Sequence, residues 1–410
     1  MVKKIAMIYR EVGTCGGIQR GASFQVVQFA SWGYEPIVLS EKDLGNDARR
    51  KDRLAAILRE READLVIEHD AYSDVKLGAD IAAAREVGVP IVVFWHSVFS
   101  WMIAVGKSAT WKVFSLLGQA DAIITLSRTD EAFFRLTGCR ALAIPYCDAD
   151  LMAGFERREH SHKILWMGCR LNDWKRPCDA IRILHKVRAK IPDAELLLLG
   201  DGSPDERAAL EKCLDEHPAV RRAVHCLGFQ KDVRPFLEMA GVGLVTSKFE
   251  GYCHAIVEMK MASLPVVSYA MPYLPALEPE NGAIVVPQRD VAAAAHAIVE
   301  LFESPSECRR QGDCSRKSYE RLRSFDDRRA YEKLFAAIED AGSNFGREQV
   351  TEEFAASAVR TLLEHCASGF DEAKRRGMSL ARKETAFRLG RAFLLPLRIL
   401  RKFVGKRCCE

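Results

Sequence analysis

Twelve short apolar runs rich in β-branched residues, separated by helical patterns, constrain the fold of this chain more than any other feature. The first half contains KKIAMIYR, EPIVLS, ADLVIEH, VPIVVFWH, DAIITLS and ALAIP. The second half contains HKILWMG, AELLLLG, AVHCLG, VGLVTS, LPVVSY and GAIVVP. Such runs, closed by Gly, Pro or Asp, are typical of parallel sheets with helices on both faces. Two series in succession predict an α/β protein with two doubly wound domains.

The two series divide the chain near its middle. A polar stretch at 147–162 has no strand pattern, so we interpret it as the linker. This predicts one domain over 1–155 and a second over 156–325, and 410 residues with 48% apolar content can supply both cores. A Gly/Ser/Asn break at 341–346 then precedes a last helical segment, which we assign to 345–410.

The cysteines indicate a reducing compartment. There are thirteen of them, an odd number, and none forms a Cys-x-x-Cys pair or a Cys/His metal-ligand spacing. The N-terminus leads directly into a strand and does not resemble a signal peptide. No apolar stretch approaches the 18 residues of a membrane-spanning helix. We therefore expect a cytoplasmic protein without a disulfide framework.

The charge is unevenly distributed. Residues 371–410 contain twelve Lys/Arg and four Asp/Glu, whereas the whole chain has a net charge of only +4. On a helical wheel, one side of this tail is basic and the other apolar. The basic residues are Arg388, Arg391, Arg398, Arg401 and Lys402, and the apolar ones are Leu389, Ala392, Phe393, Leu397, Leu400, Phe403 and Val404. This pattern favours a helix on an anionic membrane surface; the alternative is a helix that packs on the body. The mildly acidic body does not favour nucleic acid as a partner.

The stretch EGYCHAIVE, 250–258, lies between a predicted strand and a predicted helix, where α/β sheets bind ligands. Gly251 is expected in the turn, with Glu250 at the strand end and Glu258 inside the helix. Carboxylates suit sugar and ribose hydroxyls, and the N–H groups at the start of the helix favour a phosphate. The alternative is two glutamates with no role beyond the surface and the helix start.

Two further loops carry anion-binding features. GCRLNDWKRP, 168–177, places Arg170 and Lys175 after a strand, where two cations can neutralise a diphosphate, although loop cations are often merely solvated. GTCGGIQRG, 13–21, is a glycine-rich loop between the first strand and the first helix. It fits neither the dinucleotide fingerprint nor the P-loop.

These motifs together resemble glycosyltransferase family 4 (group 1), retaining enzymes of the GT-B fold. Glu250 and Glu258 match the family's E-x7-E motif, and the 168–177 loop is similar to its Gly-Arg-x4-Lys loop with Cys169 inserted. The other matching residues are Gly16 and Gly17, His96, and the loop glycines Gly200, Gly202 and Gly228. The resemblance covers roughly residues 3–340, with the motifs in the family's order.

The resemblance implies a role for each matching residue. Arg170 and Lys175 would hold the donor diphosphate with the Gly17 backbone, Glu258 the ribose and Glu250 the donor sugar. His96, from the opposite domain, would lie beside the anomeric carbon. The implied catalytic residues are Glu250, His96, Arg170 and Lys175. The implied donor-binding residues are Gly16, Gly17, Arg170, Lys175, Gly200, Gly228, Tyr252, Cys253, His254 and Glu258.

The resemblance also implies an organisation around a central cleft. The N-terminal domain would be on the acceptor side, joined by a crossover helix near 326–340, and the second domain would bind the nucleotide-sugar. The loop 96–111, with Phe99, Trp101 and Trp111, is a candidate acceptor loop. No cofactor or metal is expected, since the Asp-x-Asp at 148–150 falls in the predicted linker.

Two departures from the family pattern concern the donor and the linker. Cys253 and His254 stand where the family often has glycine and an apolar residue, which affects the identity of the donor. Tyr146-Cys147-Asp148 replaces the family's Asn-Gly-x-Asp between the domains.

We therefore expect a retaining, metal-independent glycosyltransferase at the inner face of the cell membrane. It would move a sugar, with UDP as the commonest nucleotide carrier, to a glycan or lipid-linked acceptor in cell-surface polysaccharide or glycolipid synthesis. One alternative is a nucleotide-sugar epimerase or phosphorylase, because one fold supports several chemistries. An alternative of another class is a non-catalytic, tail-anchored scaffold that binds sugar nucleotides.

Overall fold

The computed structural model describes residues 2–10, 17–100, 103, 108–146, 161–278, 281–340 and 342–375. Gly16, the Asp-x-Asp at 148–150 and all but the last two residues of the predicted linker lie outside these ranges. The same holds for residues 376–410, so most of the basic segment that begins at 371 is outside the described residues.

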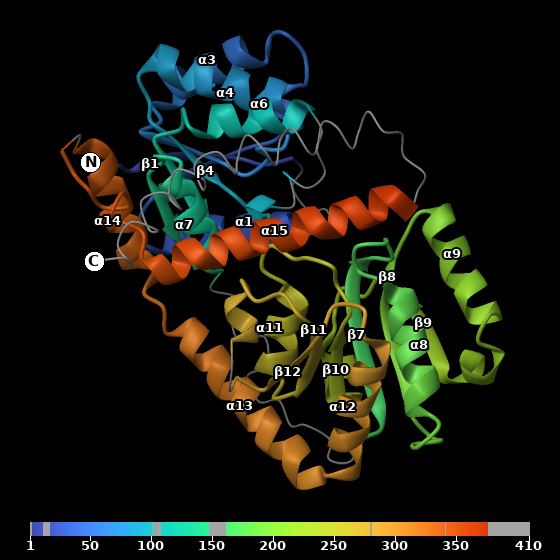
Figure 1. Cartoon of the computed structure of the whole chain (residues 1–410). Helices are drawn as coiled ribbons and strands as arrows, with labels where there is room; N and C mark the ends of the chain where they lie inside the picture. The colour runs from blue at the N-terminus through green and yellow to red at the C-terminus, as the bar shows by residue number, and fades with distance from the viewer. Residues whose placement is uncertain are drawn as a thin grey trace, which may run out of the picture.

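Two six-stranded parallel sheets form the framework of the molecule (Figure 1). In order across the first sheet, the strands are β2 (Glu35–Leu39), β1 (Lys4–Ile8), β3 (Leu65–Glu68), β4 (Ile91–Phe94), β5 (Ala122–Thr125) and β6 (Ala141–Ala143). In the second they are β12 (Ala283–Val286), β11 (Val266–Tyr269), β10 (Val242–Val245), β7 (Lys163–Arg170), β8 (Glu195–Asp201) and β9 (Val224–Gly228). Each predicted run overlaps one of these strands, with β7 and β8 extending beyond theirs to Arg170 and Asp201, and the α/β class with two doubly wound sheets is confirmed.

The central strands are covered on both faces, which explains their largely apolar sequences. All four residues of β3, β4 and β5 are buried, as are those of β10 and β11. The register of β1 with β3 pairs Ile5 with Leu65, and the ladder continues through Val66–Ile91 and Val92–Ala122. Side chains on both faces of such strands are mostly apolar because helices exclude water from each face; Glu68, Thr125 and Ser268 are the buried polar exceptions among the strands named here.

The helices form layers on the sheets. Those of the first half are α1 (Gly17–Ser31), α2 (Glu41–Leu44), α3 (Arg50–Arg61), α4 (Asp74–Val87), α6 (Ser108–Leu117) and α7 (Arg128–Leu136). Those of the second half are α8 (Pro177–Val187), α9 (Pro204–Asp215), α10 (Arg234–Met239), α11 (His254–Met261), α12 (Val291–Glu303) and α13 (Pro305–Arg323). Helices α3, α4 and α6 lie together on one face of the first sheet, as Figure 1 shows. In the second half, α8 packs beside α9 and α12, and α11 packs beside α13.

Local sequence signals set several helix starts. The Ser127 hydroxyl accepts the Asp130 backbone N–H at 3.1 Å and begins α7. Ser203 and Glu206 form a capping box at the start of α9, with Pro204 in its first turn. Such caps satisfy backbone donors that a helix leaves unpaired at its N-terminus.

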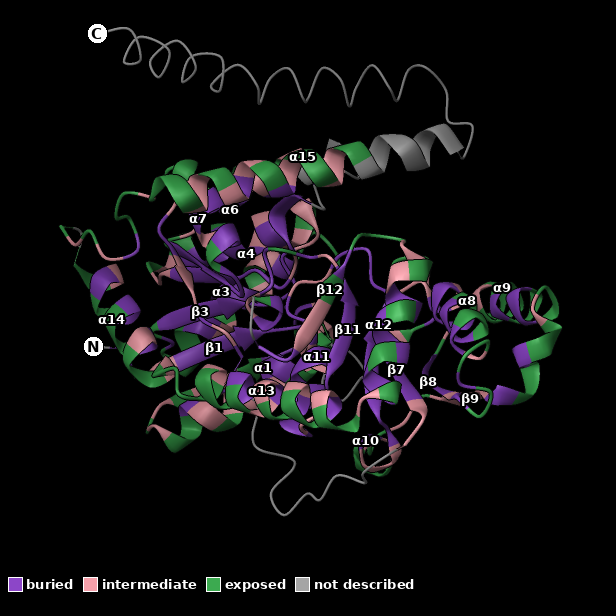
Figure 2. Cartoon of the chain, turned by 60° about the horizontal axis from the view of Figure 1, so that its bottom comes forward, coloured by how far each residue is buried: buried purple, intermediate pink, exposed green. Residues whose placement is uncertain are grey.

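The last helices of the chain return to the first half. Helix α14 (Asp327–Glu339) packs on α1, where Tyr331 meets Phe29 at a ring-centroid distance of 5.0 Å. Helix α15 (Glu352–Arg375) packs on α7, and its Ser357 hydroxyl lies 3.0 Å from that of Thr129. Figure 2 shows the buried side of α15 turned toward α6 and α7. Helix α15 therefore packs on the body; the amphipathic pattern at 388–404, for which a membrane surface was predicted, lies outside the described residues.

In the described part of the chain, no helix has both the length and the apolarity needed to cross a bilayer.

Candidate functional site

The two glutamates of EGYCHAIVE lie on a loop and a helix at the carboxyl edge of the second sheet. Strand β10 ends at Val245, so Glu250 lies farther along the loop than the predicted strand end. Glu258 lies in the second turn of α11, where its side chain is buried. The loop is longer than predicted because the run VGLVTS leaves the sheet after its fourth residue.

Lys175 and Glu250 form the central ion pair of this loop. The Lys175 Nζ donates to Glu250 Oε1 at 2.5 Å, and the Ser247 hydroxyl donates to the same oxygen at 2.5 Å. Burial is the largest single effect and acts to lower the pKa of Lys175, but the adjacent Glu250 carboxylate is first among the groups that raise it, and the net pKa is raised. The Glu250 backbone N–H donates to the Tyr273 hydroxyl at 3.1 Å, which fixes the turn. Lys175 is therefore charged and held against the E-x7-E loop.

Arg170 ends β7, and its side chain is exposed. Among the described residues it makes no ion pair, so its charge is not neutralised by a carboxylate there. Its position after the strand places it on the same connection as Lys175, before α8.

The predicted glycines serve different purposes. At Gly200, with φ at +152°, a Cβ would lie 2.1 Å from the Gly168 carbonyl oxygen, so both positions serve the close approach of β7 and β8. Gly200 is buried, and its contact with the donor stays a prediction. Gly228 ends β9 with φ at +68° and has open space where a Cβ would stand. Gly202 lies against Glu206 at the start of α9.

The N-terminus of α1 meets the N-terminus of α11. A Cβ on Gly17 would lie 3.1 Å from the His254 ring, and His254 is the first residue of α11. One turn along, the Arg20 guanidinium donates to the Glu258 carboxylate, which joins the two helices across 238 residues of sequence. Arg20 was not predicted as a site residue; its only signal was its place three residues after the glycine pair.

His96 follows β4 and is buried. Its Nε2 lies 2.9 Å from the Nδ1 of His69, and its Nδ1 contacts the Tyr146 hydroxyl. Burial, and then the nearby His69 and His254, hold the pKa of His96 well below its usual value, so the ring is neutral. A Cβ on Gly251 would lie 2.0 Å from the His96 carbonyl oxygen. Only glycine therefore allows the turn after Glu250 to approach His96 this closely.

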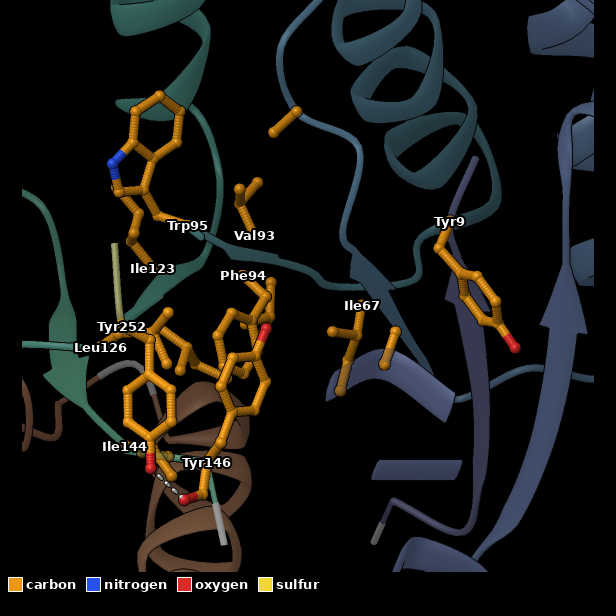
Figure 3. Packing of buried hydrophobic residues seen from close by; sticks show 14 of the residues in the cluster. Tyr9, Ile67, Val93, Phe94, Trp95, Ile123, Leu126, Ile144, Tyr146 and Tyr252 are labelled. Atoms are coloured by element: carbon orange, nitrogen blue, oxygen red, sulfur yellow. Dashed lines mark hydrogen bonds between the residues drawn. The ribbon is translucent and has the colours of Figure 1, made fainter. Parts of the chain in front are cut away.

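The residues between the two glutamates close the interface between the halves. The Tyr252 hydroxyl donates to the Tyr146 carbonyl oxygen at 2.7 Å, and Figure 3 shows the two side chains beside Phe94. Cys253 precedes α11 with φ at +65°, the left-handed region that favours glycine. This geometry explains why the family often has glycine where this chain has cysteine. Burial raises the pKa of the Cys253 thiol, so the thiol is protonated.

Helix α15 also reaches this region. The His365 Nδ1 lies 2.6 Å from the Ser100 hydroxyl, and the His365 ring lies edge-on to Tyr273 at 5.6 Å. Burial, and then Lys248, lower the pKa of His365 to about 4, so it is neutral. In the sequence, His365 gave no signal because it stands in a helix far from the motifs.

The candidate acceptor loop, 96–111, is described only in part. Its Phe99 is buried and stacks on Phe133 at 3.8 Å, whereas Trp101 lies outside the described residues.

Each half of the chain matches the model of a known glycosyltransferase family. Residues 20–143 match the model of Glycosyltransferase Family 4, and residues 161–304 match that of Glycosyl transferases group 1. The chain belongs to the group 1 glycosyltransferases of family 4. The family predicted from the ordered motifs is therefore confirmed, and the two matches fall on the two sheets.

Solved structures share the architecture of this family 4 member. Sucrose-phosphate synthase from Thermosynechococcus elongatus superposes with a TM-score of 0.67 at 19% identity, over 82% of this chain and 100% of that one. HepE from Anabaena, in complex with UDP and glucose, gives a TM-score of 0.62 at 15% identity, over 83% and 100% of the two chains. These likenesses show the fold, and the predicted GT-B class is confirmed.

A curated relative is similar over a shorter stretch. An uncharacterized glycosyltransferase from Methanocaldococcus jannaschii, MJ1059, is 30% identical over 99 residues, which is 24% of each protein. The match thus spans about a quarter of that relative's length.

Proposed function

We propose that this family 4 member transfers a sugar from a nucleotide-sugar donor to an acceptor hydroxyl, with retention of anomeric configuration. The observation that carries the proposal is the meeting of two helix N-termini, one from each half, where Gly17 of α1 touches His254 of α11. Lys175 lies near this point, since its ammonium group donates to Glu250, four residues before the start of α11.

This arrangement suits a diphosphate. Backbone N–H groups at helix N-termini point outward and carry partial positive charge, which favours an anion. Lys175 and Arg170 add full charges on one connection after β7. Fixed donors of this kind stabilise the negative charge that develops as a diphosphate departs, and we propose that they do so without a metal ion.

The two carboxylates supply sugar-binding groups. Glu258 is held by Arg20 and Glu250 by Lys175 and Ser247, so each carboxylate has a fixed orientation. We assign Glu258 to the ribose and Glu250 to the donor sugar, as in the family pattern. Glu250 shares its Oε1 between two donors, which makes it a poor nucleophile and supports front-face attack, with the leaving phosphate as the base.

We also propose a class of donor and a class of acceptor for this transfer. HepE was crystallised with UDP and glucose, and this supports UDP as the nucleotide here. For the acceptor we propose a glycan or lipid-linked glycan of the cell surface, reached at the inner face of the membrane. The basic segment 371–410 supports this, because each Lys or Arg near an anionic surface adds about 1 kcal/mol of attraction.

The donor site is tested by thermal shift and calorimetric binding with UDP-, GDP-, ADP- and TDP-sugars. One nucleotide class should stabilise the wild type, and Arg170→Ala should abolish this shift. Arg222→Ala, an exposed arginine in the 3₁₀ turn Pro218–Ala223, is the matched control and should behave as wild type. Equal shifts in Arg170→Ala and wild type, or no shift with any donor, would contradict the proposal.

The membrane contact is tested by sedimentation with vesicles. The full chain should co-sediment with vesicles containing anionic lipid and be released by high salt, because the attraction is electrostatic. A chain ended at Arg375 should stay in the supernatant. Equal partition of the two proteins would exclude residues 376–410 as the membrane contact.

A further inference from the structure

A second buried histidine, His69, contacts His96. His69 follows β3 directly, as His96 lies beyond β4, and the two strands are neighbours in the first sheet. The His69 side chain has no exposed surface. Its ring stacks on Phe94 at 5.3 Å and meets Tyr9 edge-on at 6.3 Å, so its orientation is fixed by packing.

His69, His96 and Tyr146 form a continuous chain of contacts. His69 Nδ1 lies 2.9 Å from His96 Nε2, and His96 Nδ1 contacts the Tyr146 hydroxyl. Tyr146 then stacks on His254 at 5.0 Å, the first residue of α11. The chain thus leads from β3 to the helix N-terminus that we assign to the donor diphosphate.

Each of the two histidines carries a single N–H. Burial lowers the pKa of His69 to about 3, and that of His96 is also held well below its usual value. In the 2.9 Å contact, one ring therefore donates and the other accepts. The unused Nε2 of His69 is buried and has no hydrogen-bond partner among the described residues. A buried N–H without an acceptor is rarer in proteins than an unpaired acceptor, which places the proton of His69 on Nδ1.

We propose that His69 is a positioning residue for the transfer reaction: its Nδ1–H donates to His96 Nε2 and holds His96 as the Nδ1–H tautomer, facing Tyr146. This rests on the proposed function for its effect on turnover. The orientation of the His96 ring matters because the ring contacts Tyr146, whose carbonyl oxygen accepts the Tyr252 hydroxyl from the turn beside Glu250. A rotated His96 ring would lose the Tyr146 contact and with it this support of the turn.

Two substitutions separate this role from simple packing. In His69→Asn, the side-chain amide N–H can occupy the place of Nδ1–H; in His69→Leu, a side chain of similar bulk has no donor. With ¹⁵N-labelled histidine, nuclear magnetic resonance should show His96 as the Nδ1–H tautomer in the wild type and in His69→Asn. In His69→Leu, no group donates to His96 Nε2, so the ring is no longer held in one tautomer, and the Nε2–H form should become populated beside the Nδ1–H form.

The rate of sugar transfer should depend on the tautomer of His96. We expect kcat to fall about tenfold in His69→Leu, as for the loss of one hydrogen bond to an oriented ring, with the KM for the donor unchanged. In His69→Asn, kcat should return to within about threefold of the wild type. His162→Leu, at a half-buried histidine near the start of β7, is a control that should change neither the His96 tautomer nor kcat.

Three results would overturn the proposal. These are an unchanged His96 tautomer in His69→Leu, an unchanged kcat in that variant, or a His69→Asn protein as slow as His69→Leu. The tautomer measurement needs no substrate, so it is independent of the proposed function. If the wild type transfers no sugar from any donor, the proposed function fails, and the effect on turnover fails with it.

Discussion

Lys175→Met should lower kcat/KM for sugar transfer by about a hundredfold to a thousandfold, which is the effect of removing one preorganised donor from a developing negative charge. Methionine keeps the length of the side chain but removes the ammonium group that donates to Glu250 at 2.5 Å. We expect most of the loss in kcat, because the charge on the diphosphate grows toward the transition state. Steady-state kinetics with the donor identified by the binding screen will measure it.

The same substitution also removes the ion partner of Glu250, whose side chain is only 11% exposed. Some loss of stability is therefore expected, and adding Glu250→Gln should recover stability but not activity. Lys190→Met, at an exposed lysine beyond α8, is the control and should leave kcat/KM unchanged. Activity of Lys175→Met within threefold of the wild type would remove Lys175 from the reaction.

Arg50→Met should destabilise the first sheet. We expect the free energy of the unfolding that exposes its amides to exchange, called the opening energy below, to fall by about 3–5 kcal/mol, the range for breaking a buried ion pair. The Arg50 guanidinium donates twice to the Asp80 carboxylate, each time at 2.8 Å, and once to the Gly45 carbonyl oxygen at 3.0 Å. Its side chain is 4% exposed and that of Asp80 is fully buried. Without Arg50, Asp80 remains buried beside Glu68, whose pKa burial and Asp80 already raise.

Hydrogen exchange of the amides in β3 and β4 reports this opening energy for the first sheet alone. Arg59→Met is the matched control, because Arg59 joins the same helices through Glu86 but both side chains are about half exposed. That variant should change the opening energy by less than about 1 kcal/mol. Equal effects of the two substitutions would show that the buried pair contributes no more than a surface one.

The sequence was sufficient to predict the twelve strands, because each buried parallel strand needs a largely apolar run. The family resemblance implied that Lys175 and Glu250 serve one donor site, and the structure brings them together after the neighbouring strands β7 and β10. The sequence did not predict the pairs Arg20–Glu258 and His69–His96. The first depends on how the two halves dock, and the second on which strands are neighbours in the sheet.

Other features depend on packing that the motifs do not encode. The motifs did not show that the carbonyl of Gly168 occupies the space where a side chain at Gly200 would be, so that only glycine fits there. Helix α15 packs on α7, a contact that no motif indicated, and the amphipathic pattern at 388–404 lies outside the described residues. The domain boundaries and the roles of the site residues remain predictions.

The return of α14 and α15 to the first half has a consequence for synthesis of the chain. Phe29, in the first helix, is completely buried, and its aromatic neighbours include Tyr331 and Phe335 of α14. As the chain leaves the ribosome from its N-terminus, the first sheet appears long before these partners. The half that is made first must therefore wait for nearly the whole chain before its core is complete, with part of its apolar surface exposed to chaperones until then.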